Sequence, residues 1–327
     1  MHLEHGVFTV SLDFELYWGM RDLCSIEEYK DNLDGTRTAV REMLQVFSSH
    51  GIHATWATVG FLFFTSLDEL KGNIPKSLPT YSREKLSPYK YIEEAASLDP
   101  VYHFAPDLIE LIAGYEGQEI GSHTFSHYYC LEAGQSLPQL EEDLALSIKT
   151  ANSRGISITS LVFPRNQCNP DYLSVLNKLG IRCYRGNEPH PMYAVSAGAS
   201  YGKLRRLVLL IDTCLNLSGH NTYRLEDCIR ERPFNFPASR FLRPYSRKRA
   251  ILDGLRVRRI KRSMDDAARN KRIFHLWWHP HNFGANTREN MGILCTIAEH
   301  YQQLSHKYGM KSLNMGELSC LAGEAGA

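Results

Sequence analysis

Two histidines four residues apart, His123 and His127, stand in the segment Gly-Ser-His-Thr-Phe-Ser-His at residues 121–127. Side chains at positions i and i+4 lie on the same side of a helical turn, so we expect both imidazoles to face one site. Asp13 and Glu15 end an apolar run far upstream and supply two carboxylates. Two imidazoles and a carboxylate are a frequent ligand set of catalytic metal ions, which activate water and polarise a carbonyl. The pattern therefore predicts a mononuclear metal site for hydrolysis.

A second apolar run, residues 158–163, is followed by Pro164, Arg165 and Asn166. The rigid guanidinium of Arg165 is suited to hold a carboxylate or a substrate oxygen. The alternative is a surface arginine that follows a strand and takes no part in the site.

A third run, residues 273–278, contains two tryptophans and leads into His279. We expect His279 to be a general acid, because a protonated imidazole is accessible near neutral pH. His275 shares a strand face with it and is expected behind the site, in contact with the residues that act there. The alternative for His279 is a buried histidine that packs beside the tryptophans.

The elements that must position these residues alternate along the chain. Apolar, β-rich runs predict strands at residues 7–14, 53–59, 119–122, 160–163, 183–185, 206–210 and 273–278. Helical periodicity is present at residues 36–50, 106–115, 137–154, 170–179 and 288–308. Strand followed by helix, repeated, predicts parallel strands with crossover helices. A barrel of such units would gather the site residues at the carboxyl ends of its strands.

Length and composition favour one large α/β domain. The chain has 327 residues, of which 43% are hydrophobic and 22% charged, enough to bury a large core. No linker divides it, and the predicted site draws residues from both ends. The polar, proline-containing segment at residues 60–101 is expected to be an insertion near the barrel mouth.

The cysteines and the amino terminus favour a cytoplasmic location. The eight cysteines show no paired C-x-x-C spacing, and we expect them to be reduced thiols. The first predicted strand begins within the first ten residues, which leaves no room for a signal peptide. No apolar run of 18 residues is present, so no membrane span is expected.

Four segments match, in order and spacing, the motifs of one known family: residues 11–15, 122–127, 163–165 and 276–280. By these segments the chain resembles the polysaccharide deacetylases, carbohydrate esterase family 4 with its chitooligosaccharide-deacetylase homology domain, over about residues 5–320. Members remove N- or O-acyl groups from sugars. The resemblance implies a distorted (β/α)7-type barrel, a metal held by the His-x-x-x-His motif and a general-acid histidine in the last motif.

The first motif departs from that of the secreted members. They carry two adjacent aspartates, whereas Phe14 separates Asp13 from Glu15 here. This spacing and the His-Pro pair at residues 279–280 are more similar to the cytosolic, allantoinase-like branch. By that analogy Glu15 is the metal ligand, with the two histidines, and Asp13 is the base. Because residues i and i+2 of a strand share a face, the exchanged assignment stays open.

The resemblance also assigns Arg165 as the partner of the catalytic carboxylate, although Pro164 precedes it here instead of following it. Zinc is the expected metal, and cobalt, nickel or iron would also suit two imidazoles and a carboxylate. The remaining side chains at the ends of the last two motifs are expected to line the sugar pocket: Trp278, His281, Asn282 and Asn166.

One segment breaks the near-neutral charge of the chain, which is +1 overall. Residues 239–272 hold thirteen lysines or arginines and three aspartates. They are either the solvated face of a helix at residues 250–271 or a groove for an anionic ligand, such as an acidic polysaccharide or the diphosphate of a nucleotide-linked or lipid-linked sugar. No nucleic-acid-binding motif accompanies the charge.

The sequence thus predicts a metal-dependent deacetylase, a hydrolase of carbon–nitrogen bonds other than peptide bonds. It would remove an N-acyl group, most simply N-acetyl, from a sugar during the biosynthesis of a surface polysaccharide. Two alternatives stay open: an allantoinase-like or imidase-like hydrolase of a small cyclic amide, and a carbohydrate-binding protein that has lost the chemistry.

Overall fold

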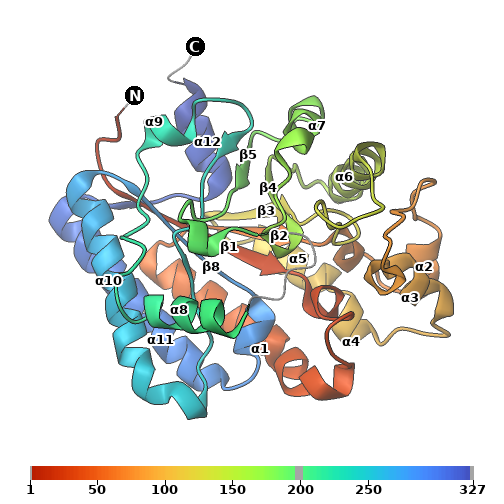
Figure 1. The fold of residues 1–327 in the computed structure, drawn as a ribbon, viewed down its shortest axis with the longest axis horizontal. Coiled ribbons are helices and arrows are strands. Elements are labelled where there is room, and N and C mark those ends of the chain that lie inside the picture. The colour runs from red at the N-terminus through yellow and green to blue at the C-terminus, as the bar shows by residue number, and fades with distance from the viewer. Residues whose placement is uncertain (1, 196–201, 325–327) are drawn as a thin grey trace.

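The computed structural model describes residues 2–195 and 202–324, which fold around one curled sheet (Figure 1). Nine parallel strands of these residues form it, in the order β6-β5-β4-β3-β2-β1-β8-β7, with β9 beside β1. The strands are β1 (Val7–Phe14), β2 (Ala54–Thr58), β3 (Gln118–Ser122), β4 (Ser160–Val162), β5 (Cys183–Arg185), β6 (Phe234–Asn235), β7 (Arg240–Phe241), β8 (Ile273–Trp278) and β9 (Lys311–Ser312).

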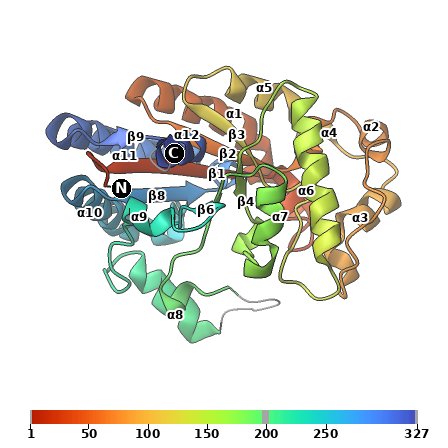
Figure 2. The same cartoon turned by 90° about the horizontal axis from the view of Figure 1, so that it is seen from above.

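Helices surround the sheet, and the longest of them, α1, α6, α10 and α11, lie on its outside (Figures 1 and 2). The α-helices are α1 (Ile26–His50), α2 (Leu67–Lys71), α3 (Pro88–Glu94), α4 (Pro100–His103), α5 (Pro106–Ala113), α6 (Leu137–Asn152), α7 (Leu173–Lys178), α8 (Lys203–Asp212), α9 (Leu225–Cys228), α10 (Asp253–Asn270), α11 (Thr287–Tyr308) and α12 (Met315–Glu324). Short 3-10 turns are η1 (Leu16–Gly19), η2 (Gly60–Phe63), η3 (Glu84–Leu86), η4 (Pro164–Asn166), η5 (Pro170–Tyr172), η6 (Pro191–Tyr193), η7 (Arg247–Leu252) and η8 (Pro280–Phe283).

The two edges of the sheet approach each other through one short stretch of chain. The N–H of Phe236, just beyond β6, donates to the carbonyl of Tyr184, on β5, at 3.0 Å. Three residues later the Ser239 N–H donates to the carbonyl of His275, on β8, at 2.8 Å. The segment from β6 to β7 therefore crosses from one edge to the other and curls the sheet into a half-barrel. This confirms the α/β class and the distorted (β/α)7-type barrel in a single domain.

The central strand β1 is buried along its whole length, as expected for a parallel strand rich in β-branched and aromatic residues that is covered on both faces. On the side of α1, Phe47 contacts Trp278 of β8 and Trp56 of β2 at ring-centroid distances of 6.1 and 6.2 Å. Helix α1 begins with a capping box, in which Ser25 and Glu28 satisfy each other's backbone N–H groups. The buried strands thus fix where the polar side chains at their ends lie.

The predicted strands and helices are largely present, with one error. Residues 206–210, predicted as a strand, belong to the helix α8. The run Arg-Leu-Val-Leu-Leu is short and apolar, and such a run does not by itself distinguish a strand from a helix. Leu207 of this helix is 52% exposed, which a buried parallel strand would not allow. The helix predicted at residues 250–271 is present as η7 and α10.

No helix in the described ranges has both the length and the apolar composition needed to cross a bilayer. All eight cysteines lie in these ranges, and all are free thiols.

Candidate metal centre

Glu15, His123 and His127 meet at the carboxyl ends of β1 and β3. The Glu15 Oε2 atom lies 2.9 Å from Nε2 of His127 and 3.3 Å from Nε2 of His123. One ligand atom from each residue lies within 4.8 Å of the others, and all three side chains are buried. The structure therefore groups Glu15, rather than Asp13, with the two histidines.

The two histidines do not lie on a helical turn, contrary to the expectation from their spacing. Residues 123–127 form a loop in which Thr124 and His127 have φ values of 63° and 59°. Asp143 of α6 holds this loop, because its carboxylate accepts the N–H of Phe125 at 2.7 Å and the hydroxyl of Ser126. Burial raises the pKa of Asp143 to about 7, although these hydrogen bonds favour the carboxylate. The sequence analysis missed Asp143. The available signal was an acidic residue between Leu140 and Leu144, on the buried face of the predicted helix.

The three side chains fit a divalent cation. The ring of His123 makes a hydrogen bond through Nδ1 to the carbonyl of Val162 at 2.9 Å, which leaves its Nε2 buried without a hydrogen-bond partner. A backbone carbonyl in this position fixes the tautomer of metal-binding histidines. Burial lowers the pKa of His127 to about 4, so this ring is neutral at pH 7, as a ligand must be.

Glu15 supplies the negative charge of this group. Burial raises the pKa of its carboxyl, but the adjacent His279 and His127 reverse this effect, and the pKa is lowered well below its usual range. Gly19 makes room for the group, because a Cβ atom there would lie 2.0 Å from Oε1 of Glu15. Two imidazoles and one carboxylate are a donor set typical of Zn²⁺ and of similar ions.

Asp13 is paired with an arginine that the sequence analysis did not select. Arg185, at the end of β5, donates from its two terminal nitrogens to the two carboxylate oxygens of Asp13 at 2.7 and 2.8 Å. Both side chains are almost fully buried. Burial raises the pKa of Asp13, but the charges of Arg185, His123 and His279 outweigh it, and the pKa is lowered. Asp13 is therefore an oriented, ionised carboxylate beside the metal ligands.

The prediction that Arg165 holds the catalytic carboxylate is wrong. Arg165 pairs with Asp22, and its guanidinium lies over the ring of Tyr129 at 4.5 Å. The edge-to-face contact between Tyr129 and His127, at 5.1 Å, connects it only indirectly to the metal ligands. Position explains the error: Arg165 has left β4 and stands in a turn with φ of 54°. Arg185 was detectable, because it ends a strand that the sequence predicted.

Polar side chains under the site support Arg185. Ser11 of β1 accepts a hydrogen bond from Arg185 at 2.9 Å, and its Oγ lies 2.8 Å from Nε2 of His275. The Oδ1 atom of Asn166 also accepts from Arg185, at 2.9 Å. His275 is fully buried behind the site, where the strand alternation places it. Asn166, expected to contact the sugar, instead contacts the arginine that holds Asp13.

His279 follows β8 and faces both carboxylates. Its Nε2 lies 3.7 Å from Oδ2 of Asp13 and 3.6 Å from Oε1 of Glu15. The side chain is 23% exposed, so it reaches both the buried carboxylates and solvent. Trp277 and Phe241 flank it at ring-centroid distances of 5.7 and 5.9 Å. His279 is thus placed to exchange a proton between the site and a molecule that enters it.

The turn η8 behind His279 is held tightly against α1. A Cβ atom at Gly35 would lie 2.1 Å from the carbonyl oxygen of Gly284, so only glycine allows this approach. Tyr29 of α1 donates its hydroxyl to Asn282 at 2.7 Å, and Nδ2 of Asn282 lies 3.4 Å from Nδ1 of His279. Asn282 therefore orients the ring of His279.

Two residues expected to line the sugar pocket, Trp278 and His281, are buried. Trp278 is 0% exposed and packs against Phe47 and Phe283, on the side of the sheet away from the metal centre. Alternation along β8 explains this, because His275, Trp277 and His279 share the opposite face. His281 is 2% exposed, and its Nε2 lies 3.9 Å from Oε1 of Glu15. Burial lowers its pKa to about 3, so it is a neutral neighbour of Glu15.

Comparison with known proteins agrees with this arrangement. The sequence profile of the polysaccharide deacetylase family matches residues 33–184, which include His123 and His127. A structure from Mycobacterium smegmatis assigned to the polysaccharide deacetylases superimposes with a TM-score of 0.57 at 11% identity, over 99% of this chain and 92% of that one. The 4-alpha-glucanotransferase from Thermococcus litoralis superimposes with a TM-score of 0.55 at 11% identity, over 97% of this chain.

The present chain spans 40% of the longer glucanotransferase chain. No curated protein sequence matches this one. At such low identity the two superpositions show a shared fold, whereas the family profile matches the sequence itself around the two histidines. Residues 33–184 of the chain, a little under half of its length, therefore match the polysaccharide deacetylase family.

Proposed function

We propose that this protein is a metal-dependent hydrolase that removes an N-acyl group, most simply N-acetyl, from a sugar used to build a surface polysaccharide. One observation carries the proposal. A Glu-His-His group whose ligand atoms lie within 4.8 Å of one another, an arginine-held aspartate and a partly exposed histidine meet at the ends of β1, β3 and β8. The free cysteines favour the cytoplasm as the place where it acts.

Glu15, His123 and His127 would hold the ion, most simply zinc. When bound, such an ion supplies Lewis-acid polarisation of the acyl carbonyl and lowers the pKa of water. Asp13 accepts a proton from the attacking water, and Arg185 keeps both of its oxygens in a fixed orientation. His279 donates a proton to the leaving amine, with its ring oriented by Asn282.

The test is acetate release from N-acetylated sugars, nucleotide sugars and oligosaccharides by metal-loaded protein. The wild type is compared with His123→Ala, Asp13→Asn and His279→Ala. An exposed histidine on α11 serves as the control, in the variant His306→Ala. We expect release by the wild type and the control and a loss of at least a hundredfold in the three site variants. Metal-loaded wild type that hydrolyses none of these compounds would contradict the proposal.

A further inference from the structure

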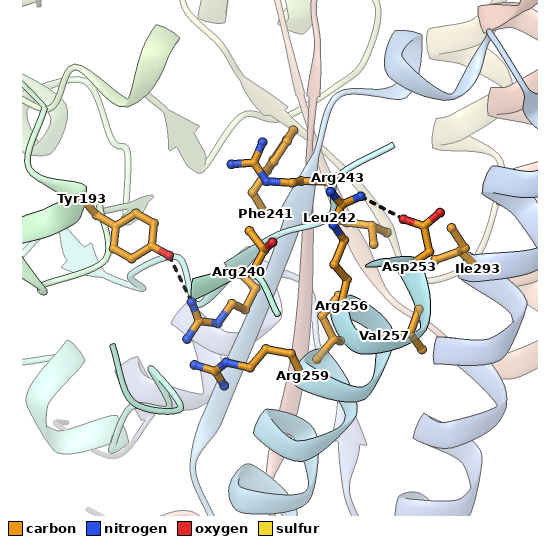
Figure 3. A pocket seen from close by; sticks show the side chains of 12 residues that line it. Tyr193, Arg240, Phe241, Leu242, Arg243, Asp253, Arg256, Val257, Arg259 and Ile293 are labelled. Atoms are coloured by element: carbon orange, nitrogen blue, oxygen red, sulfur yellow. Dashed lines mark hydrogen bonds and ion pairs between the residues drawn. The ribbon is translucent and has the colours of Figure 1, made fainter. Parts of the chain in front are cut away.

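A second charged cavity, the arginine pocket, lies between β7 and α10 (Figure 3). Four arginines line it: Arg240 and Arg243 from β7 and the chain that follows it, and Arg256 and Arg259 from α10. The volume of this cavity is about 50 Å³. A cavity needs roughly 10–15 Å³ of this volume to hold one water molecule. The pocket therefore has room for a group as large as a few water molecules, such as a tetrahedral oxyanion.

The protein neutralises only part of the positive charge in this pocket. Arg240 pairs with Asp212 at 2.6 Å, and Arg256 pairs with Asp253 at 2.8 Å. Arg259 donates to the side-chain oxygen of Asn216 at 2.8 Å and to the carbonyl of Gly219, and neither of these acceptors carries a charge. Within the described part of the chain, the four guanidinium groups thus have two carboxylates as direct partners, and two positive charges remain.

Arg243 is the member of the pocket with the fewest partners. Across residues 2–195 and 202–324 its guanidinium makes no hydrogen bond or ion pair, its Nε is buried, and it contacts the face of Phe241 at 5.8 Å. Burial and the nearby charge of Arg256 lower the pKa of Arg243. Burial and the charge of Arg240 lower the pKa of Arg259 to about 10. Both shifts have the direction that unbalanced like charges produce, and an anion in the pocket would reverse them.

The arginine pocket adjoins the metal centre. Phe241 lines the pocket, and its ring centroid lies 5.9 Å from that of His279 and 4.7 Å from that of Trp277. One aromatic ring therefore separates the proposed proton donor from the pocket. A molecule that presents its acyl group to His279 can reach the pocket with its next substituent.

We propose that the arginine pocket binds a phosphate or diphosphate group carried by the sugar substrate. The proposal rests on the proposed hydrolysis at the metal centre and adds the class of substrate: a sugar phosphate or diphosphate ester. Guanidinium groups suit this ligand, because their planar donors match pairs of phosphate oxygens. The two unbalanced charges equal the charge of a phosphate dianion. Nucleotide-linked and lipid-linked sugars share this group.

The first test measures binding without turnover, so it does not depend on the proposed reaction. Pyrophosphate is titrated into wild type, Arg243→Gln and Arg258→Gln by isothermal calorimetry. Arg258 lies exposed on α10 outside the pocket, and its substitution removes the same charge. We expect binding by wild type and Arg258→Gln, and affinity about tenfold weaker in Arg243→Gln, the loss of one charge-assisted hydrogen bond. Val257→Asp, which places a carboxylate in the lining, is expected to abolish binding.

The second test compares kcat/KM for acetate release from N-acetylglucosamine, its 1-phosphate and its uridine diphosphate ester. We expect the phosphate-bearing substrates to be preferred at least tenfold, and Arg243→Gln to remove most of this preference through KM. A diphosphate-linked N-acetylglucosamine on a short polyprenyl chain, dispersed in detergent, is compared with the uridine ester. The preferred member of this pair identifies the natural carrier.

The outcomes separate the two proposals. Pyrophosphate binding that weakens in Arg243→Gln, without acetate release from any substrate, would support the phosphate site and contradict the proposed reaction. Acetate release from all three sugars at equal kcat/KM, with no pyrophosphate binding, would support the reaction and overturn the phosphate site. Equal pyrophosphate affinity in wild type, Arg243→Gln and Val257→Asp would also overturn it.

Discussion

The metal centre and the arginine pocket are neighbours that balance their charges differently. In the metal centre every charged group has a partner inside the protein: Arg185 holds Asp13, and two imidazoles surround Glu15. In the arginine pocket, two of the four guanidinium groups form ion pairs with carboxylates of the described residues. Phe241 separates the two regions.

The difference indicates what each region requires from outside. A carboxylate and two imidazoles, one of them with a buried nitrogen that makes no hydrogen bond, are complete when a cation is present. Buried positive charges without partners are costly, and an arriving anion relieves that cost. The first region is therefore suited to a resident ion and the second to a charge that the substrate brings.

The largest effect is expected from replacing the two carboxylates of the metal centre one at a time. Asp13→Asn should keep the metal and lower kcat by about 10²–10⁴-fold, because it removes the proton acceptor. Glu15→Gln should lose the metal, and activity with it, because it removes the only charged ligand of the group. Metal content by atomic spectroscopy and acetate release measure the two effects. If Asp13→Asn lost the metal and Glu15→Gln kept it, Asp13 would be the metal ligand and Glu15 the proton acceptor.

The buried ion pair gives the next effect. Arg185→Gln should lower the free energy of unfolding by about 3–5 kcal/mol, because it leaves the carboxylate of Asp13 buried and unpaired. Chemical denaturation measures this loss. Arg165→Gln is the matched control: its pair with Asp22 is more exposed, so it should lose much less stability. A larger loss in Arg165→Gln would show that the turn at η4, rather than β5, supports the site.

The loop that carries the histidines depends on Asp143. Asp143→Ala should weaken metal affinity about 10–100-fold, the size expected when a residue that orients metal ligands is removed. Competition with a coloured chelator measures the affinity. Glu141→Ala, on the same helix, removes only a surface pair with Lys178 and should leave the affinity unchanged. Unchanged affinity in Asp143→Ala would mean that the loop keeps its shape without this anchor.

The sequence indicated the metal centre well because its residues follow long, buried strands. The apolar runs of β1 and β8 end directly before Glu15 and His279, so their positions in the barrel could be predicted from strand direction alone. Strand direction alone does not place Trp278, because alternation along β8 turns its side chain to the opposite face, against Phe47 and Phe283. His123 and His127 were placed correctly in the barrel and wrongly on a helix, because side-chain contacts with Asp143 decide the loop conformation.

The region around the arginine pocket was less predictable. Strands β6 and β7 have two residues each, too short for any periodicity. The apolar run at residues 206–210 predicts a strand where α8 lies, and the basic segment at residues 239–272 fits both a solvated helix face and an anion site. The structure places basic side chains on both sides of the helix: Arg258 is exposed, whereas Arg256 and Arg259 line the pocket. Which arginines face inward depends on tertiary packing against β7.

Salt should affect the two regions unequally, and this is the smallest expected effect. Raising the ionic strength from about 0.1 M to about 1 M shortens the screening length from about 10 Å to about 3 Å. Attraction between the half-buried Arg243 and a phosphate should weaken, so KM for the uridine diphosphate ester should rise severalfold. KM for unphosphorylated N-acetylglucosamine should stay within about twofold, because the fully buried pair of Asp13 and Arg185 is little screened. Equal salt dependence for the two substrates would place the phosphate outside the arginine pocket, in contact with exposed surface charges.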